Sequence, residues 1–264
     1  MDYVASGTKT ANPKAKIVFK LDRLVLDELV ESPTLDEYSC LVIDEAHERT
    51  ISIDVILGLV KELLQKRKNF KVIITSASME ISLFEKYFNT KTLKVSGRMF
   101  PVNVQYLPSK EEDTVKKIEK AIDNELLTER NMLKDKYKGH ILVFCADTSE
   151  IEALTEIFKR KLNHNVFMVI PLHGKLTPEE QRKAFSKTKE HKLIFASRIA
   201  ETAITIDGVK VVIDPGWDRE MQYDQKTKFS SMKLVEISQS SAKQRAGRAG
   251  RTQEGYCLRL YSEQ

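Results

Sequence analysis

In LVIDEAH (residues 41–47), a short apolar run ends in two adjacent acids, Asp44 and Glu45. Apolar runs of strand length, this one included, occur at residues 40–43, 71–75, 141–144, 166–170, 193–196 and 209–213. They are continuous rather than alternating, which favours parallel strands covered on both faces. Segments of helix length lie between them, at residues 51–66, 148–162 and 177–185. The alternation predicts an α/β fold with a parallel sheet.

A domain boundary is predicted near residues 97–101, where SGRMFP follows a strand-like run at 93–95. We expect one α/β unit over residues 1–97, a linker over 98–105 and a second unit over 106–264. In the second part, residues 102–107 read as extended and residues 110–138 as a long charged helical stretch. The first unit has room for two or three central strands only, so we expect it to be incomplete at its N-terminus, with an exposed core.

The composition is that of an ordinary soluble protein. The 264 residues are 41% hydrophobic and 31% charged, which excludes a disordered tail, a collagen-like fibre and a disulfide miniprotein. The net charge of +5 permits a polyanion partner without requiring one. Cys40, Cys145 and Cys257 each lie in or beside an apolar run, so we expect buried free thiols in a reducing compartment. A polar start and the lack of a long apolar run predict an intracellular protein with no membrane segment.

The acid pair suggests a site for a metal–phosphate complex. At the carboxyl end of a parallel strand, Asp44 and Glu45 would face the crevice where ligands bind. One carboxylate could hold Mg²⁺, directly or through water, while the other orients an attacking water. The alternative is a strand end with solvated acids, which the full apolar strand and His47 disfavour.

A second informative segment is QRAGRAGR (residues 244–251), which is rich in arginine and in small residues. Arg248 and Arg251 are three apart, so we expect them on one face of a helical turn. There they could aim two guanidinium groups at one phosphate, while alanine and glycine clear space beside the backbone. A solvated basic face, the alternative, would not need two glycines among its arginines.

With these two segments the chain resembles the DEAH-box RNA helicases of superfamily 2, of the type that serve splicing and ribosome assembly. The resemblance covers essentially the whole chain, and the motifs occur in the family's order. They are DEAH at 44–47 (motif II), SAS at 76–78 (III), GRMFPV at 97–102 (the interdomain link), VF at 143–144 with EIE at 150–152 (IV), IAETAITIDG at 199–208 (V) and residues 244–251 (VI). The resemblance implies two RecA-like parallel-sheet domains, the first of them incomplete.

The resemblance also implies roles in the hydrolysis of ATP or another nucleoside triphosphate with Mg²⁺. Asp44 would hold the metal through water, and Glu45 beside it would polarise the attacking water. His47 would contact Gln244 across the cleft between the domains. The residues implied to read the γ-phosphate are Gln244, Arg248 and Arg251, and those implied to couple the nucleotide to domain movement are Ser76 and Ser78.

Further residues are implied for the base, the ribose and RNA. Phe185 would stack on adenine, the alternative being an ordinary core aromatic. Thr205 and Asp207 would face the ribose and base edge, the alternative being a capped turn. Ser197 and Arg198, which stand where the family usually has Thr and Asn, would contact the backbone of single-stranded RNA. The resemblance allows activator proteins and a place in the nucleus or cytoplasm, with the nucleus favoured.

One family element has no counterpart in the sequence. No Gly-x-x-x-x-Gly-Lys-Ser/Thr loop occurs, and SGTKT at residues 6–10 does not fit that spacing. We therefore expect a fragment of an ATP-dependent RNA helicase, without the phosphate loop and the C-terminal accessory domains, that has little activity alone. The alternative is a non-catalytic RNA- or partner-binding module, favoured by departures from the family pattern at residues 21–23 and 146–147.

Overall fold

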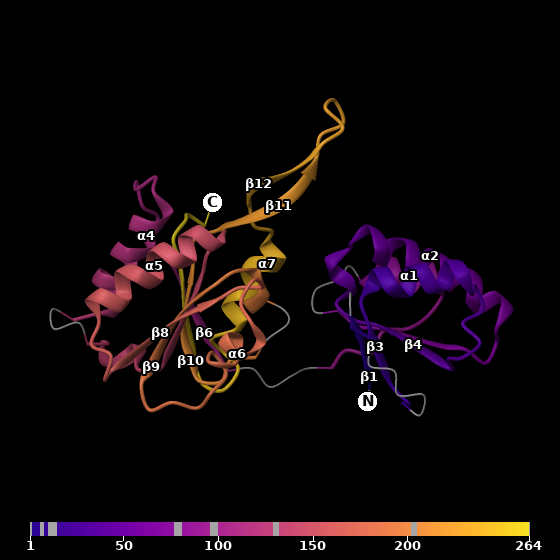
Figure 1. The fold of residues 1–264 in the computed structure, drawn as a ribbon, viewed down its shortest axis with the longest axis horizontal. Helices are drawn as coiled ribbons and strands as arrows, with labels where there is room; N and C mark the ends of the chain where they lie inside the picture. The colour runs from indigo at the N-terminus through magenta and orange to yellow at the C-terminus, as the bar shows by residue number, and fades with distance from the viewer. Residues whose placement is uncertain are drawn as a thin grey trace. The chain divides into compact units, whose positions relative to one another are not determined.

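The computed structural model of the chain describes residues 2–5, 8–9, 15–76, 81–95, 100–128, 132–201 and 205–263. It divides into two compact units, Met1–Val95 and Ser96–Gln264 (Figure 1). Each unit is an α/β structure with its own core, in agreement with the predicted fold class. The first two residues of the predicted linker, 98 and 99, lie outside the described residues.

Among the residues that the structure describes, the first unit contains two small sheets. In chain order its elements are β1 (Asp2–Ala5), β2 (Thr8–Lys9), β3 (Val18–Lys20), α1 (Asp22–Glu31), β4 (Cys40–Ile43), a 3-10 turn (Ala46–Glu48), α2 (Ile51–Lys66), β5 (Lys71–Ile74) and α3 (Ile81–Phe88). One sheet has the order β2-β1-β3, and the other is the parallel pair β4-β5. The pair lies beneath α1 and α2 in Figure 1, and these helices supply most of the buried side chains of this unit.

The pair β4-β5 is covered on one face only within the described residues. Ile43 is buried against α2, whereas Val42 is 56% exposed and Ile73 is 51% exposed. Because successive side chains of a strand point to opposite faces, the helices can cover only alternate residues. The expected exposure of the first unit's core is therefore found, and the expectation of coverage on both faces is wrong for these two strands.

The second unit is built on a six-stranded sheet. Its elements are β6 (Val102–Tyr106), α4 (Thr114–Ala121), a π-helical turn (Ile122–Leu126), a 3-10 turn (Asp135–Tyr137), β7 (His140–Phe144), α5 (Thr148–Lys161), β8 (Phe167–Leu172), α6 (Pro178–Arg182), β9 (His191–Ala196), a 3-10 turn (Arg198–Ala200), β10 (Val209–Asp214), β11 (Trp217–Tyr223), β12 (Ser230–Glu236), α7 (Gln239–Gly247) and β13 (Gly255–Arg259). All six strands of the sheet are parallel, in the order β6-β13-β10-β7-β9-β8.

Both faces of this sheet are covered, as the continuous apolar runs predict. On one face, Ile141 and Val143 of β7 pack with Phe158 of α5 in a core that also includes α4. On the other face, Leu142 and Phe144 belong to a core with Ala246 and the segment that follows it. In Figure 1, α4 and α5 lie on one side of the sheet, and α6 and α7 lie on the other.

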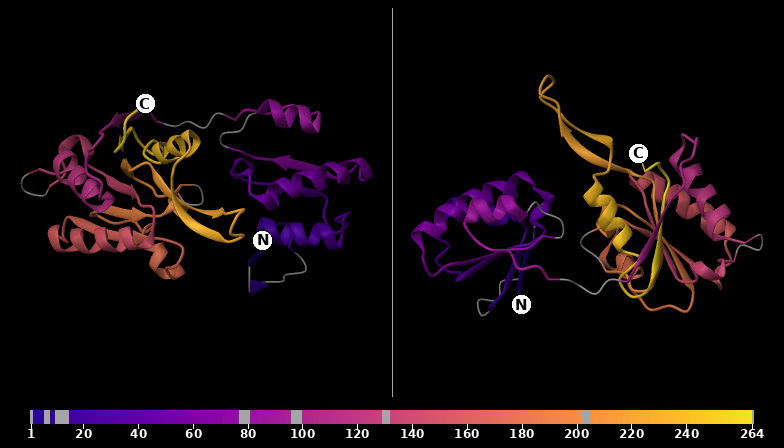
Figure 2. Two further views of the ribbon diagram at one scale, coloured as in Figure 1. Left: turned by 90° about the horizontal axis from the view of Figure 1, so that it is seen from above. Right: turned by 180° about the vertical axis from the view of Figure 1, so that it is seen from behind.

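The antiparallel pair β11-β12 forms a hairpin that extends away from the sheet (Figure 2). Its outer part is solvent-exposed, with Met221 63% and Phe229 76% exposed. No helix in the described ranges is long and apolar enough to cross a membrane.

Two predicted elements are absent. Residues 93–95 form no strand, and Leu93 and Val95 are 85% and 83% exposed. In place of the long helix predicted over 110–138, α4 ends after eight residues, and the π-helical turn Ile122–Leu126 directs the chain into the core. The turn lets Leu126, Leu127 and Leu133 all become buried, and Leu127 then pairs with Leu133 as an isolated bridge. Burial of apolar side chains outweighs the helical pattern here.

Candidate functional site

The two acids of LVIDEAH lie in a turn that is fastened to the end of β5. Ala46 N–H donates to Thr75 O at 3.0 Å, and Thr75 N–H donates to Ile43 O at 2.9 Å. The Thr75 hydroxyl donates to Asp44 Oδ1. Thr75 was not singled out in the sequence, although its place between the end of β5 and Ser76 could have drawn attention to it.

Glu45 occupies the left-handed region at φ 53°, which costs a non-glycine residue about 1 kcal/mol. Its N–H donates to Asp44 Oδ1 at 3.0 Å, and its Oε2 lies 3.3 Å from His47 Nε2. The following helix starts at a defined place, because Thr50 Oγ1 accepts from Ile53 N–H at 3.2 Å and caps α2. The turn therefore holds both carboxylates at the carboxyl end of β4, as predicted.

These carboxylates suit a metal that arrives with a phosphate ligand better than a structural metal. Asp44 is exposed, and both bonds that it accepts within the described ranges fall on Oδ1, none on Oδ2. The same ranges contain no cluster of three or more His, Cys, Asp or Glu that could enclose a metal ion. Mg²⁺ typically uses one or two carboxylates together with waters and substrate phosphates, which fits this donor set.

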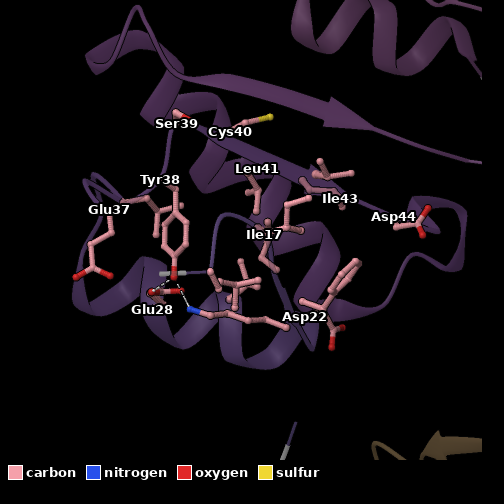
Figure 3. A pocket seen from close by; sticks show the side chains of 18 of the residues that line it. Ile17, Asp22, Glu28, Glu37, Tyr38, Ser39, Cys40, Leu41, Ile43 and Asp44 are labelled. Carbon is pink, nitrogen blue, oxygen red and sulfur yellow. Dashed lines mark hydrogen bonds and ion pairs between the residues drawn. The ribbon is translucent and has the colours of Figure 1, made fainter. Parts of the chain in front are cut away.

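A cavity of about 660 Å³ lies beside this turn, between β3, α1 and β4 (Figure 3). Asp44 stands at one end of it, and Lys20, Glu28 and Tyr38 are bonded together at the other. Burial alone would lower the pKa of Lys20, but its bonds to Glu28 and Tyr38 raise it. Cys40 also lines the cavity and is exposed, so the expectation of a buried thiol is wrong there. Like Val42, it lies on the uncovered face of β4.

In the second unit, the arginine-rich segment is anchored by Arg245. Its side chain is 1% exposed and lies 3.0 Å from Glu201 Oε2, 3.0 Å from Asp214 Oδ1 and 3.6 Å from Asp218 Oδ2. Burial alone would lower the pKa of Arg245, but the charges of Asp214 and Glu201 raise it. Burial raises the pKa of Asp218. Sequence reasoning missed Arg245, because its acidic partners come from three separate segments.

Arg248 and Arg251 are bonded to Glu201 and Thr205, which stand on either side of residues outside the described ranges. Arg248 is buried and donates through Nη2 to Glu201 O, whereas the exposed Arg251 donates through Nη1 to Thr205 Oγ1. Helix α7 ends at Gly247, and the chain continues as a turn in which the N–H groups of residues 248, 249 and 250 each donate to the carbonyl three residues earlier. That Arg248 and Arg251 aim their guanidinium groups at one phosphate stays a prediction.

Phe185 is 40% exposed and belongs to neither core of its unit, which disfavours the interpretation as a core aromatic. It follows α6, where Thr177 and Glu180 form the predicted capping arrangement around Pro178. The helix itself is shorter than expected and ends at Arg182.

The remaining predicted contacts also lie in the second unit. Asp207 is exposed and precedes Gly208, whose φ of 77° marks a tight turn into β10. Ser197 N–H donates to Leu172 O at 3.0 Å. Arg198 faces acids of the hairpin, with Nη1 3.5 Å from Glu220 Oε1 and Nε 3.9 Å from Asp218 Oδ2.

A family model described as the helicase conserved C-terminal domain matches residues 116–253, which include the segments around Phe185, Thr205 and Arg248. The chain belongs to this helicase family. Relatives include the human probable ATP-dependent RNA helicase DHX34, which is 40% identical over 99% of this chain and 24% of its own length. HrpA of Escherichia coli, an ATP-dependent RNA helicase, is 39% identical over 92% of this chain and 18% of its own length.

The helicase fold is also found among solved structures. The Escherichia coli DEAH/RHA helicase HrpB superposes with a TM-score of 0.85 and 26% identity, over 99% of this chain and 33% of that chain. The relatives are thus DEAH-box helicases, and this chain spans about a quarter or less of the length of the curated proteins above.

The predicted helicase residues fall into two groups. The first unit holds Asp44, Glu45, His47 and Ser76, and the second holds Gln244, Arg248 and Arg251 with the residues for base, ribose and RNA. Ser78 lies outside the described residues. A contact between His47 and Gln244 joins different units and stays a prediction.

Proposed function

We propose that this chain supplies the acid pair and the arginine-rich segment of an ATP-dependent RNA helicase. The observation that supports this most is that Arg248 is bonded to Glu201 and Arg251 to Thr205, all four within the matched helicase domain. The names of the relatives, which are ATP-dependent RNA helicases, support the same activity. In the whole protein, nucleotide hydrolysis would be coupled to translocation on RNA, unwinding, or remodelling of RNA–protein complexes.

In the proposed reaction, these residues act by position and charge, which supply nearly all of the catalysis in phosphoryl transfer. Asp44 would hold Mg²⁺, which neutralises charge on the phosphates when bound, and Glu45 would orient the attacking water. Gln244, Arg248 and Arg251 would contact the γ-phosphate from the second unit. The turn that carries the acids is bonded to Thr75, which directly precedes Ser76 in the chain. Through this connection, Ser76 and Ser78 would transmit the state of the nucleotide to domain movement.

The base, the ribose and RNA would be bound by the second unit. Phe185 is exposed enough for its ring to stack on a base. Thr205 and Asp207 would contact the ribose and the edge of the base. Ser197 and Arg198 would contact an RNA phosphate. Arg198 would then leave Asp218 and Glu220 of the hairpin and bind the phosphate instead, so that its positive charge would stay neutralised.

A non-catalytic RNA- or partner-binding module is the second candidate. It is favoured by one observation, the lack of Gly-x-x-x-x-Gly-Lys-Ser/Thr among the 264 residues. Without that loop, the backbone cradle for the β- and γ-phosphates has to come from elsewhere, so residues 1–264 alone should turn over little ATP.

RNA-stimulated ATP hydrolysis tests the proposal, measured for residues 1–264 and for the whole protein. In the whole protein, Arg248→Ala and Arg251→Ala should each lower turnover about 10³-fold or more, the effect of removing an arginine finger. Glu45→Gln should abolish it. Lys243→Ala is the matched control, because Lys243 is exposed on α7 beside the same segment.

Near-normal rates in both arginine variants would remove these residues from the assignment. RNA binding by a whole protein that hydrolyses no nucleotide would favour the non-catalytic module. Fast turnover by residues 1–264, lost in Glu45→Gln, would show that the missing loop is not needed.

A further inference from the structure

A buried lysine lies directly behind Phe185. Lys192 belongs to β9 and is only 2% exposed. Its ammonium donates to Ala184 O at 2.8 Å and to Ser186 O. These two carbonyls flank Phe185 in the chain. A buried ammonium group is costly unless hydrogen bonds replace its water, so the two bonds are what make Lys192 tolerable at this place.

The same bonds fix the backbone that carries the aromatic ring. After α6, the chain continues as a turn in which Phe185 N–H and Ser186 N–H donate to Arg182 O at 3.0 and 3.1 Å. Ala184 is fully buried, whereas Phe185 is 40% exposed. The turn is therefore held from the sheet side, and the ring is presented to solvent.

Lys192 is also linked electrostatically to the other predicted base contact. Burial lowers the pKa of Lys192, and the charge of Asp207 acts in the opposite direction. Its own backbone is held as well, since Lys192 N–H donates to His140 Nδ1 at 3.1 Å. The side chain of Lys192 thus connects β9 with the turn that carries Phe185.

We propose that Lys192 is a positioning residue for the nucleotide base, acting through Phe185. The inference rests on the proposed function, in which Phe185 stacks on the base. The ammonium group touches no ligand in this role. It holds the carbonyls of Ala184 and Ser186, so the turn keeps one conformation. The ring of Phe185 is then already in place, and binding of the base does not cost the conformational entropy of ordering it.

The test compares a ligand that has a base with one that lacks it. Affinities of the 264-residue chain for ATP and for inorganic tripolyphosphate are measured with Mg²⁺ present. Phe185→Ala and Lys192→Met should each weaken ATP binding about tenfold, the typical effect of losing an aromatic stack, and leave tripolyphosphate binding unchanged. Because Lys192 acts through Phe185, the double variant should be no weaker than Phe185→Ala alone.

Lys187→Met is the matched control, since it removes the same charge from an exposed lysine of the same connection. Hydrogen exchange of residues 183–190 provides a second measurement, with protection lost there in Lys192→Met and kept elsewhere in the unit. If Lys192→Met does not fold, Lys192→Gln, which retains one donor group, replaces it in all arms.

The outcomes separate this inference from the proposed function. If Phe185→Ala weakens ATP binding and the lysine variant does not, the positioning role is overturned and the base site stands. Equal losses for ATP and tripolyphosphate in the lysine variant would mean a general structural role and would also overturn it. If the unaltered chain binds ATP no better than tripolyphosphate, or binds neither, the base contact of the proposed function fails and the positioning role fails with it.

Discussion

Strands β4 and β7 are alike in sequence and different in the folded chain. β4 is CLVI and β7 is HILVF, both continuous and apolar. β7 lies between β10 and β9, and all of its residues after His140 are buried. β4 pairs with β5 alone within the described residues, and only Ile43 is buried. An apolar run thus identifies a strand, whereas its neighbours decide how much of the strand is removed from water.

The charged groups differ between the units in the same way. In the first unit, Arg49 and Asp54 form an ion pair at the surface, where their side chains are 53% and 41% exposed. In the second, Arg245 meets Glu201 and Asp214 where no side chain is more than 3% exposed. Solvent screens the charges of Arg49 and Asp54, whereas the buried charges of Arg245 and its acids can be compensated only by other groups of the protein.

The largest effect is expected for Arg245→Met, which would leave acidic side chains buried without their cation. Unfolding free energy of the second unit should fall by about 3–5 kcal/mol. Urea unfolding followed by the fluorescence of Trp217, the only tryptophan of the chain, measures it.

Arg49→Met is the counterpart in the first unit. It should cost at most about 1 kcal/mol, as hydrogen exchange of α2 can measure. Similar costs for the two variants would contradict the comparison of buried and exposed ion pairs.

A matched pair of valines tests the comparison of strands. Val212 of β10 is fully buried and Val42 of β4 is 56% exposed. Val212→Ala should cost about 2 kcal/mol because it removes packed methyl groups, whereas Val42→Ala should change stability by about 0.5 kcal/mol or less. Hydrogen exchange of each unit measures both. A cost at Val42 as large as that at Val212 would show that the outer face of β4 is covered in solution.

Acid should weaken the second unit through His140. Burial, with the charge of Lys192, lowers the pKa of His140 to about 4, and its Nδ1 accepts from Lys192 N–H. The folded state therefore resists protonation. The contribution of His140 is complete above the ordinary pKa near 6.5 and is lost as pH falls through about 4.

The loss should be on the order of 1 kcal/mol, because His140 is only half-buried and solvent screens part of the effect. His140→Gln cannot titrate but can still accept the bond, so its stability should fall less between pH 7 and pH 4. Parallel pH profiles of the two proteins, followed by Trp217 fluorescence, would exclude His140 as the group responsible.

The smallest perturbation is thiol labelling of the unaltered chain, with one cysteine variant as its control. Cys40 is exposed, whereas Cys145 and Cys257 are buried. Burial raises the pKa of Cys145 well above its usual value and that of Cys257 to about 12. One thiol should react quickly in the native chain, and Cys40→Ser should abolish that phase. Fast labelling of a second thiol would indicate that the core of the second unit opens.

Much of the architecture could be predicted because it depends on local pattern. The strands at residues 40–43, 71–75 and 193–196 and the helix α2 follow from apolar runs and from the Thr50 cap. The Thr177–Glu180 capping box could likewise be predicted, because it is formed within four consecutive residues. The helix predicted over 110–138 was wrong because burial of Leu126 and Leu133 depends on the sheet beneath them, which no local pattern contains.

The sequence by itself determined the alternation of strands and helices, the positions of the acids and arginines, and the order of the helicase motifs. The tertiary structure alone decided which charges are buried and what they bind. Arg245 lies far along the chain from Glu201, and Lys192 acts on carbonyls of another segment. Neither could be predicted, because the free energy of a buried charge depends on partners that only the folded chain brings within hydrogen-bonding distance.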